Sequence, residues 1–442
     1  METCAVTTDG WTEQYTSTSY NGTTIHYIDA GFELRSAVLG TRQMAVSHTA
    51  ANILEETSRV LEEYLPGWKE RGVVSAFVTD NAANMKKAFE DHTRLSCACH
   101  NLNLVVGHAL GATALRDPAY AALARQIAVC KSLVSLVKRK GLNHLLEKSL
   151  KQQVETRWNS LLTMIRSVLE ALPELRSQER FAQSDVSDLV DQLSRSQLHA
   201  LIDLLQPFEM ASEQLSAASY STLHLVVPAK ERLMRSLSVK TEDTFAIKKL
   251  KEVLRRLLDE KFVLEDEHFV AAALWPPHRH FRGMQTVSKA RVRQVHESLE
   301  EEVRHLRDRP PQVQEVSQTP LVPPAEPTPG PSSSSVSFFS FGEEDDTAAP
   351  KPCQDDVGEY LEDPGPMTCG GDITKVLQYW KTTGSRFPVL QRVARKLLAV
   401  PASSAPSERL FSAAGRTVEP RRTCLLPDTV DDILFLHAAL RQ

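Results

Sequence analysis

The sequence predicts an α/β protein in which a small mixed sheet forms early in the chain and a long helical region follows. Strand-like alternation and helix-like periodicity succeed one another over residues 1–113. From residue 114 to about 308, apolar residues instead recur every three or four positions, which is typical of packed helices. Three acids stand at the end of a predicted strand or near the start of a predicted helix: Asp9, Asp80 and Glu408.

Five segments of the first part are short and rich in β-branched or apolar residues, which predicts strands. They are Cys4–Asp9, Thr16–Ile28, Phe32–Leu39, Val73–Thr79 and Arg94–Cys97. Gly10–Thr12 is expected to turn the chain after the first strand. Helices are expected over His48–Leu65, from Asp80–Asn81 onward, and from about His100 to Leu110. Three strands, a helix, a strand, a helix and a strand is the order of an RNase H-like domain, so the order predicts this fold.

Residues 309–371 differ sharply in composition from the rest of the chain. They hold 12 of the 24 prolines, a serine run at Ser332–Ser335 and an acidic cluster at Glu343–Asp346. Such a segment buries too little apolar surface to offset the entropy that ordering it would cost. The sequence therefore predicts a disordered linker here.

Two amphipathic helices are expected at the end of the chain. The first follows the loop Pro401–Pro406 and carries Glu408 close to its start, and the second begins near Pro427. Their apolar side chains are expected to form a surface for self-association. These side chains are Leu410, Phe411, Ile433, Leu434 and Leu436.

The totals limit the classes of protein that fit. With 442 residues the chain is long enough for two or three domains. Its net charge of −5 lacks the basic excess of a strong non-specific DNA binder, so any nucleic-acid surface must be local. Seven scattered cysteines suit a reducing compartment better than a disulfide framework. No signal peptide and no membrane-spanning run are expected, so we expect an intracellular protein.

The stretch Ser-Glu408-Arg-Leu-Phe-Ser-Ala-Ala-Gly, two following arginines and Leu-Leu-Pro…Ile-Leu-Phe-Leu resemble the C-terminal signature of hAT-superfamily transposases and their BED-type zinc-finger relatives. The resemblance implies an RNase H-like domain interrupted by a large all-helical insertion, with C-terminal dimerisation helices. The implied divisions are a core over 1–113, the insertion over 114–308, the linker over 309–371, and a C-terminal region over 372–442 that completes the core. No zinc-finger pattern is found, so the BED finger of the family is expected to be lacking.

The three acids suggest metal-dependent chemistry when they are taken together. Phosphoryl-transfer enzymes of the RNase H type need carboxylates that converge on two divalent ions, which are hard cations with a preference for oxygen. The resemblance matches Asp9, Asp80 and Glu408 to the catalytic triad of the family and implies Mg²⁺ or Mn²⁺ at these residues. Taken singly, each acid is better explained as a helix cap or a solvated strand end.

Cys97-Ala-Cys99-His100 invites a zinc interpretation. On a strand the two thiols would point to opposite sides, and no second ligand pair follows at finger spacing, so zinc is not expected. Cys97 and His100 resemble the Cys-x-x-His motif of the family, which implies support of the active site. A buried thiol and a hydrogen-bonded histidine explain the same residues equally well.

Arg157 and Trp158 resemble the Arg-Trp motif of the family, which implies contact with DNA. An indole beside a guanidinium suits stacking on a base together with a phosphate contact. A tryptophan that anchors the first helix of the insertion in the core is an equally weighted alternative.

Three interpretations of function remain at this stage. The first is a domesticated or decayed hAT element product, nuclear and DNA-associated, that dimerises through its C-terminal region. The second is an active cut-and-paste transposase core with a two-metal site. The third is a protein-interaction scaffold without DNA binding. The expected partners are a second copy of the chain and DNA, with no membrane and no small-molecule substrate.

Overall fold

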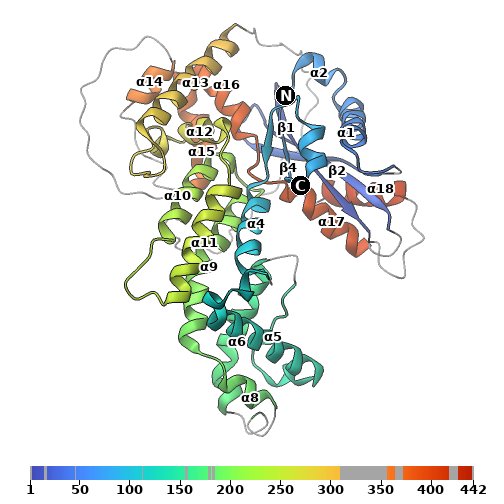
Figure 1. Ribbon diagram of the computed structural model, residues 1–442. Helices are drawn as coiled ribbons and strands as arrows, with labels where there is room; N and C mark the ends of the chain where they lie inside the picture. The colour runs from blue at the N-terminus through green and yellow to red at the C-terminus, as the bar shows by residue number, and fades with distance from the viewer. Residues whose placement is uncertain are drawn as a thin grey trace.

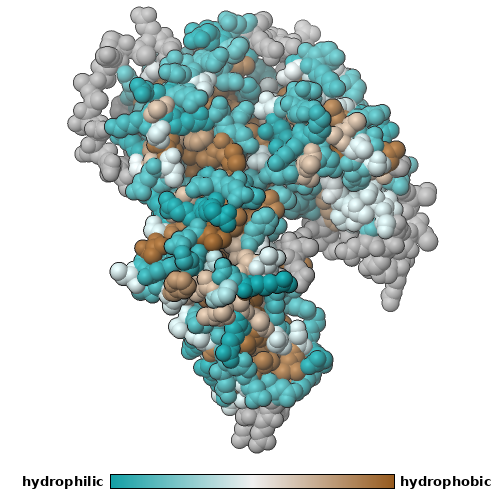
Figure 2. Space-filling view, viewed as in Figure 1, coloured by the Kyte–Doolittle hydropathy of each residue, from teal (hydrophilic) through white to brown (hydrophobic). Residues whose placement is uncertain are grey.

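A five-stranded sheet and a long helical arm are the two main parts of the structure (Figure 1). This computed structural model describes residues 2–13, 17–44, 46–111, 113–154, 158–177, 181, 185–308, 356–363, 372–417 and 427–440. The arm, which contains α5, α6 and α8, projects from the part that carries the sheet, so the outline of the molecule is bent (Figure 2).

The strands are β1 (Cys4–Thr12), β2 (Ser19–Ile28), β3 (Leu34–Gln43), β4 (Val74–Thr79) and β5 (Arg94–Ser96). Their order across the sheet is β3-β2-β1-β4-β5, with antiparallel pairing among the first three and parallel pairing of β4 with β1 and β5. The expected mixed sheet is confirmed. The expected turn at Gly10–Thr12 was wrong, because these residues continue β1 and pair with residues 19–21 of β2.

Four helices follow the strands of this first part: α1 (Ala50–Tyr64), α2 (Trp68–Arg71), α3 (Ala83–Ala88) and α4 (Ala98–Leu110). One face of the sheet packs against α1 and α3 mainly through apolar side chains, among them Val6, Ile25, Leu61, Phe77 and Phe89. The opposite face receives α4 and the C-terminal helices, which are red in Figure 1 and lie beside the blue strands.

Between residues 114 and 308 the described residues form only helices and short 3-10 turns. The helices are α5 (Ala121–Arg139), α6 (Trp158–Ser177), α8 (Asp185–Asp191), α9 (Arg195–Leu215), α10 (Val226–Ser236), α11 (Phe245–Lys261), α12 (Asp266–Ala273) and α13 (Lys289–Arg307). The 3-10 turns are η1 (Ala114–Arg116), η2 (Pro118–Tyr120), η3 (Leu142–Leu145), η4 (Leu223–Leu225) and η5 (Pro276–His278).

One segment differs from the expectation of no membrane-length run. Pro118–Arg139 is long and apolar enough, by length and composition, to cross a membrane. Within the fold, α5 buries side chains along most of its length, among them Leu123, Ile127, Leu133 and Val137. Its apolar character is therefore accounted for by packing in the helical core.

The last part contains α14 (Asp356–Glu362), α15 (Val376–Thr383), α16 (Pro388–Leu398), α17 (Ala405–Thr417) and α18 (Pro427–Ala439), with 3-10 turns at η6 (Ile373–Lys375) and η7 (Gly384–Arg386). Helix α14 lies inside the segment predicted to be a disordered linker, so the prediction was wrong for these residues. Tyr360 is fully buried and its hydroxyl donates to the carbonyl oxygen of Ala273 (2.9 Å). This packing stabilises α14 although the composition of the surrounding segment is typical of disorder. The rest of the predicted linker, 309–355 and 364–371, lies outside the described residues.

Helices α17 and α18 return to the sheet about 300 residues after its last strand. Phe411 of α17 packs over Gly22 of β2, where a Cβ atom would lie 3.0 Å from the ring and the ring would have to shift, so glycine favours this close approach. Asp431 of α18 accepts the backbone N–H of Thr41 on the edge strand β3 (2.5 Å). The C-terminal helices thus cover one face of the sheet and satisfy part of its open edge.

Candidate active site

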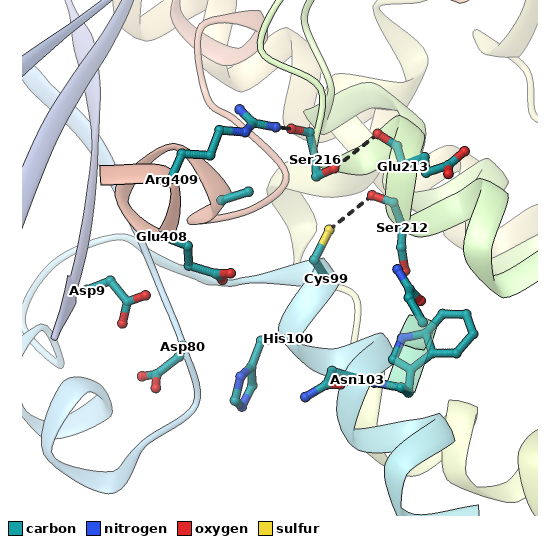
Figure 3. A pocket seen from close by; sticks show the side chains of 13 residues that line it. Asp9, Asp80, Cys99, His100, Asn103, Ser212, Glu213, Ser216, Glu408 and Arg409 are labelled. Atoms are coloured by element: carbon teal, nitrogen blue, oxygen red, sulfur yellow. Dashed lines mark hydrogen bonds between the residues drawn. The ribbon is translucent and has the colours of Figure 1, made fainter. Parts of the chain in front are cut away.

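A cleft of about 570 Å³ lies where the sheet, α17 and the helical region meet (Figure 3). Its walls combine acidic, amide and aromatic side chains from parts of the chain that are far apart in sequence. The lining residues are Asp9, Asp80, Cys99, His100, Asn103, Trp158, Asn159, Ser212, Glu213, Ser216, Ala405, Glu408 and Arg409. The structure thus brings Asp9, Asp80 and Glu408 together in one cleft.

Strand register places two of these acids side by side. Thr7 of β1 pairs with Val78 of β4, and extending this parallel register by two residues sets Asp9 level with Asp80. Because alternate residues of a strand share a face, Asp9 and Asp80 point to the same side as Thr7 and Val78. This is the face that receives α4 and α17, so both carboxylates reach the cleft from neighbouring strands.

The environment of Asp9 opposes its ionisation. Burial, and then the nearby carboxylates of Glu408 and Asp80, raise the pKa of Asp9 to about 7, although a hydrogen bond from the Gly10 amide (2.8 Å) opposes the shift. A carboxyl group among like charges gains strongly from a bound cation, which removes the repulsion.

Asp80 is held in place through its backbone. Its side chain accepts the amide of Ala82 (3.1 Å), which fixes the turn into α3. Arg94 of β5 donates to the carbonyl oxygen of Asp80 (2.5 Å), to Thr79 Oγ1 (2.8 Å) and to Asn81 Oδ1 (3.0 Å). One half-buried guanidinium therefore ties together the three residues that end β4.

Glu408 is positioned by its neighbour in the first turn of α17. The hydroxyl of Ser407 lies 2.9 Å from Thr7 Oγ1 on β1, and Thr7 in turn lies 3.2 Å from Nε2 of the buried His26. Arg409, on the other side of Glu408, donates to the carbonyl oxygen of Ser216 at the end of α9. The helix start is thus fixed to the sheet on one side and to the helical region on the other.

The Cys97–His100 segment joins α4 to the loop that precedes α17. Cys97 caps α4, and its sulfur accepts the amides of His100 (3.4 Å) and Ser404 (3.3 Å), which joins α4 to the loop before α17. Burial raises the pKa of Cys97 to about 11. The predicted strand over Arg94–Cys97 ends at Ser96, so Cys99 lies in α4, where its thiol donates to Ser212 O (3.5 Å).

Trp158 lines the cleft but presents little of its ring to solvent. The side chain is 7% exposed and packs edge-on against Phe208 of α9, with ring centroids 6.5 Å apart. These contacts agree with the interpretation in which Trp158 anchors the first helix of the insertion in the core. Arg157 lies outside the described residues.

The five residues predicted for self-association divide into two groups. Leu410, Phe411 and Leu434 are buried within the chain, where Phe411 stacks on Trp11 of β1 (5.9 Å between centroids). Ile433 and Leu436 are exposed on the outer side of α18. Sequence reasoning left out Phe435 and Leu440, which are exposed on the same helix although the apolar spacing could have indicated them.

The donor set suits a hard divalent cation in chemistry. Asp9, Asp80 and Glu408 offer only carboxylate oxygens, which Mg²⁺ and Mn²⁺ prefer. Among the described residues, no three His, Cys, Asp or Glu side chains already form a closed metal cluster. Glu213 lines the same cleft from α9 but is directed away from the other three carboxylates (Figure 3).

The fold and site together define an α/β protein with an acidic cleft closed by its C-terminal helices. Residues 357–440 match the hAT family C-terminal dimerisation region. The chain is 28% identical over 281 residues to the Drosophila melanogaster transposable element Hobo transposase, covering 63% of this chain and 41% of that protein. It is 22% identical over 474 residues to a putative AC transposase of Zea mays, covering 97% and 56% of the two chains.

A human zinc finger BED domain-containing protein 4 is 23% identical over 409 residues, covering 86% of this chain and 32% of that protein. The chain is therefore a relative of the hAT transposases and of the BED zinc-finger proteins. It spans between about a third and a little over half the length of these relatives.

Proposed function

We propose that this chain is a transposase-derived, DNA-associated nuclear protein whose acidic cleft binds divalent cations and cleaves DNA strands. The observation that carries the proposal is the meeting of three carboxylates from β1, β4 and α17 in one cleft. In this proposal the sheet belongs to an RNase H-like core over 1–113 and 372–442, the helices of 114–308 form an insertion, and 309–371 connects the two.

The topology supports an RNase H-like core. Three antiparallel strands lie beside two parallel ones in the order β3-β2-β1-β4-β5, and the first and fourth strands carry the acids. The third acid comes from a late helix, as metal-dependent phosphoryl transfer of this type requires. Similarity to the Hobo and AC transposases agrees with this assignment.

Asp9, Asp80 and Glu408 would hold the cation. A divalent ion bound there would stabilise charge on the attacking and leaving oxygens of a phosphodiester. The protein's own residues fix the geometry: Arg94 holds the loop of Asp80, and Ser407 with Thr7 holds Glu408 against β1. Hydrolysis would form a P–O bond from water and break the P–O bond to the leaving 3′ oxygen, which then takes up a proton.

Self-association would proceed through α18. Ile433, Phe435, Leu436 and Leu440 form an exposed apolar surface on this helix, within the region that matches the dimerisation model. An apolar helix surface of this kind is stabilised when it is covered by a second copy.

A nicking assay tests the enzymatic part of the proposal. Supercoiled plasmid is incubated with the intact protein and Mg²⁺ or Mn²⁺, and the relaxed product is measured for the native chain, Glu408→Gln, Asp9→Asn and the control Glu213→Gln. We expect ion-dependent nicking that is lost in the first two variants and kept in the third. Equal nicking by Glu408→Gln, or no nicking by the native chain, would contradict strand cleavage and favour a scaffold.

A further inference from the structure

A second, smaller groove lies on the helical arm. It has a volume of about 140 Å³ and is lined by Lys131, Val134, Ser135, Gln152, Gln153 and Met164. One wall is α5, the other is α6, and the segment that precedes α6 runs along it. The groove does not overlap the acidic cleft in any lining residue.

Lys131 lines this groove, Lys138 bonds the lining residue Gln152, and Lys151 directly precedes Gln152 in the chain; we call the groove with these three lysines the lysine groove. Lys131 and Lys138 are seven residues apart on α5, which places them on the same side of the helix about 10 Å apart along its axis. Lys138 Nζ donates to Gln152 Oε1 (2.7 Å), beside Lys151. All three lysines are exposed, and none forms an ion pair with any residue that the structure describes.

The nearest other lysines show the contrast. Lys140 pairs with Asp185 (3.2 Å) and Lys148 pairs with Glu170 (3.1 Å), so their charge is balanced locally. No ion pair with a described residue balances the three lysines of the groove, in a protein whose net charge is −5. The groove is therefore a local cationic site on an acidic molecule.

The lysine groove and the acidic cleft are both lined by residues from the first turns of α6. Trp158 and Asn159 line the cleft, while Met164, less than two turns later, lines the groove. Between them, the Ser160 hydroxyl bonds both the amide and the carbonyl of Val154 (2.8 Å each), which fixes the preceding segment against the helix. The two sites therefore adjoin the start of the same helix.

Two amide oxygens at these sites have no partner among the residues that the structure describes. The side-chain oxygen of Gln153 in the groove and that of Asn159 in the cleft are buried and accept no hydrogen bond from this part of the chain. An unsatisfied buried acceptor costs about 1–3 kcal/mol, so such groups are commonly completed by a ligand or by water.

We propose that the lysine groove binds the phosphate backbone of DNA that extends from the acidic cleft. This inference rests on the proposed function, because it takes the cleft to be a DNA site. Lysines act as point charges toward phosphates without reading bases, and their spacing along α5 suits a linear polyanion. The groove would therefore add affinity without sequence preference.

The test compares two charge-matched triple variants of the full chain. One replaces Lys131, Lys138 and Lys151 with Glu. The other replaces Lys289, Arg293 and Arg304 with Glu, which are exposed on α13 at the opposite end of the molecule (Figure 1). Fluorescence anisotropy of a random-sequence DNA duplex is recorded over a salt series, and circular dichroism checks that both variants fold.

We expect the groove variant to bind about tenfold more weakly or worse, with the slope of log K against log salt reduced by about 3, since each phosphate contact contributes roughly 0.9. The α13 variant should keep the native slope. Equal slopes for the native chain and the groove variant, or equal losses in both variants, would overturn the lysine groove while leaving nicking at the acidic cleft untouched. An acidic protein segment is the alternative occupant of the groove, and binding of a polyglutamate peptide is measured in the same way to test it. If the groove variant lost peptide binding but bound DNA as the native chain does, the proposal would also be overturned.

Discussion

The two faces of the sheet differ in the part that polar contacts play. The face beneath α1 and α3 is packed mainly through apolar side chains, with Phe77 stacked on Phe89 (4.5 Å) and packed edge-on against Trp68 (6.0 Å), and a buried hydrogen bond joins Asn21 of β2 to Thr57 of α1 (3.2 Å). The face beneath α4 and α17 adds to its apolar packing a hydrogen bond between Thr7 of β1 and Ser407, the residue next to Glu408 (2.9 Å). Apolar packing supplies stability without fixing direction, whereas the polar contacts fix where the carboxylates point.

The largest effect is expected on the apolar face. Phe77→Ala should lower the free energy of unfolding by about 3–5 kcal/mol, because Phe77 is 1% exposed and its removal leaves a cavity. Urea denaturation followed by circular dichroism measures this. Val239→Ala, at a largely exposed position, is the control and should change stability by less than about 0.5 kcal/mol. A loss for Phe77→Ala no greater than that of the control would contradict the apolar role of this face.

On the polar face, the contact between Thr7 and Ser407 should be coupled. A double-mutant cycle with Thr7→Val and Ser407→Ala is expected to give a coupling energy of about 1 kcal/mol, because each variant leaves a buried hydroxyl without its partner. Urea denaturation of the four proteins provides the cycle. The exposed pair Thr12 and Ser19, also 2.9 Å apart, is the matched control and should couple less. Additive losses at Thr7 and Ser407 would show that this contact does not fix α17.

Asp9 should make stability depend on pH in the direction opposite to most acids. Its pKa rises from 3.8 to about 7 on folding, mainly through burial and then through Glu408 and Asp80, so the folded state holds this proton more tightly. Its contribution to stability is therefore lost as pH rises through this window. Without divalent ions, the Asp9→Asn variant should have the same free energy of unfolding as the native chain near pH 3.8. Above about pH 7 the variant should be more stable by ~1–2 kcal/mol, after allowance for the partial exposure of Asp9.

Thermal unfolding across the pH range measures this difference. Asp29 is a control of opposite sign: burial alone would raise its pKa, but hydrogen bonds from the Glu33 amide and Arg35 lower it, so Asp29→Asn should lose stability at the higher pH. A native chain more stable than Asp9→Asn at high pH without added ions would argue against carboxylate repulsion in the cleft.

The smallest effect on folding is expected at the outer side of α18. Ile433→Asp with Leu436→Asp should change the free energy of unfolding of the monomer by less than about 0.5 kcal/mol per site, because both side chains are exposed. The same variant should shift a dimer to monomer in sedimentation equilibrium. Leu434→Ala, at a buried position on the same helix, should instead cost about 2–5 kcal/mol. Unchanged self-association of the double variant would remove α18 as the interface.

Local patterns were sufficient to predict the strands of the sheet and the two final helices. Alternating and periodic patterns of apolar residues involve positions that are close in sequence, so they can be recognised without knowing the fold. The meeting of Glu408 with the two aspartates was expected only from family resemblance, since no local pattern relates residues about 400 positions apart. Register explains why Asp9 and Asp80 coincide, but register is visible only in the structure.

The contacts that position the acids could not be predicted. Ser407, Thr7 and His26 are ordinary residues in sequence, and their role depends on the α17–β1 contact. Arg94 donates to a backbone carbonyl, that of Asp80, and a contact of this kind has no sequence motif. Helix α14 was missed because proline-rich flanks outweighed Val357 and Tyr360, two apolar residues spaced for one side of a helix.

Calorimetric titration of the intact chain with Mn²⁺ tests the central claim most directly, since it needs neither DNA nor turnover. The account predicts binding by the native chain that is weakened strongly by Asp9→Asn, Asp80→Asn and Glu408→Gln alike, and little by Glu213→Gln, which lines the same cleft. Native-like binding by Glu408→Gln would contradict it, because the third carboxylate would then play no part in the site.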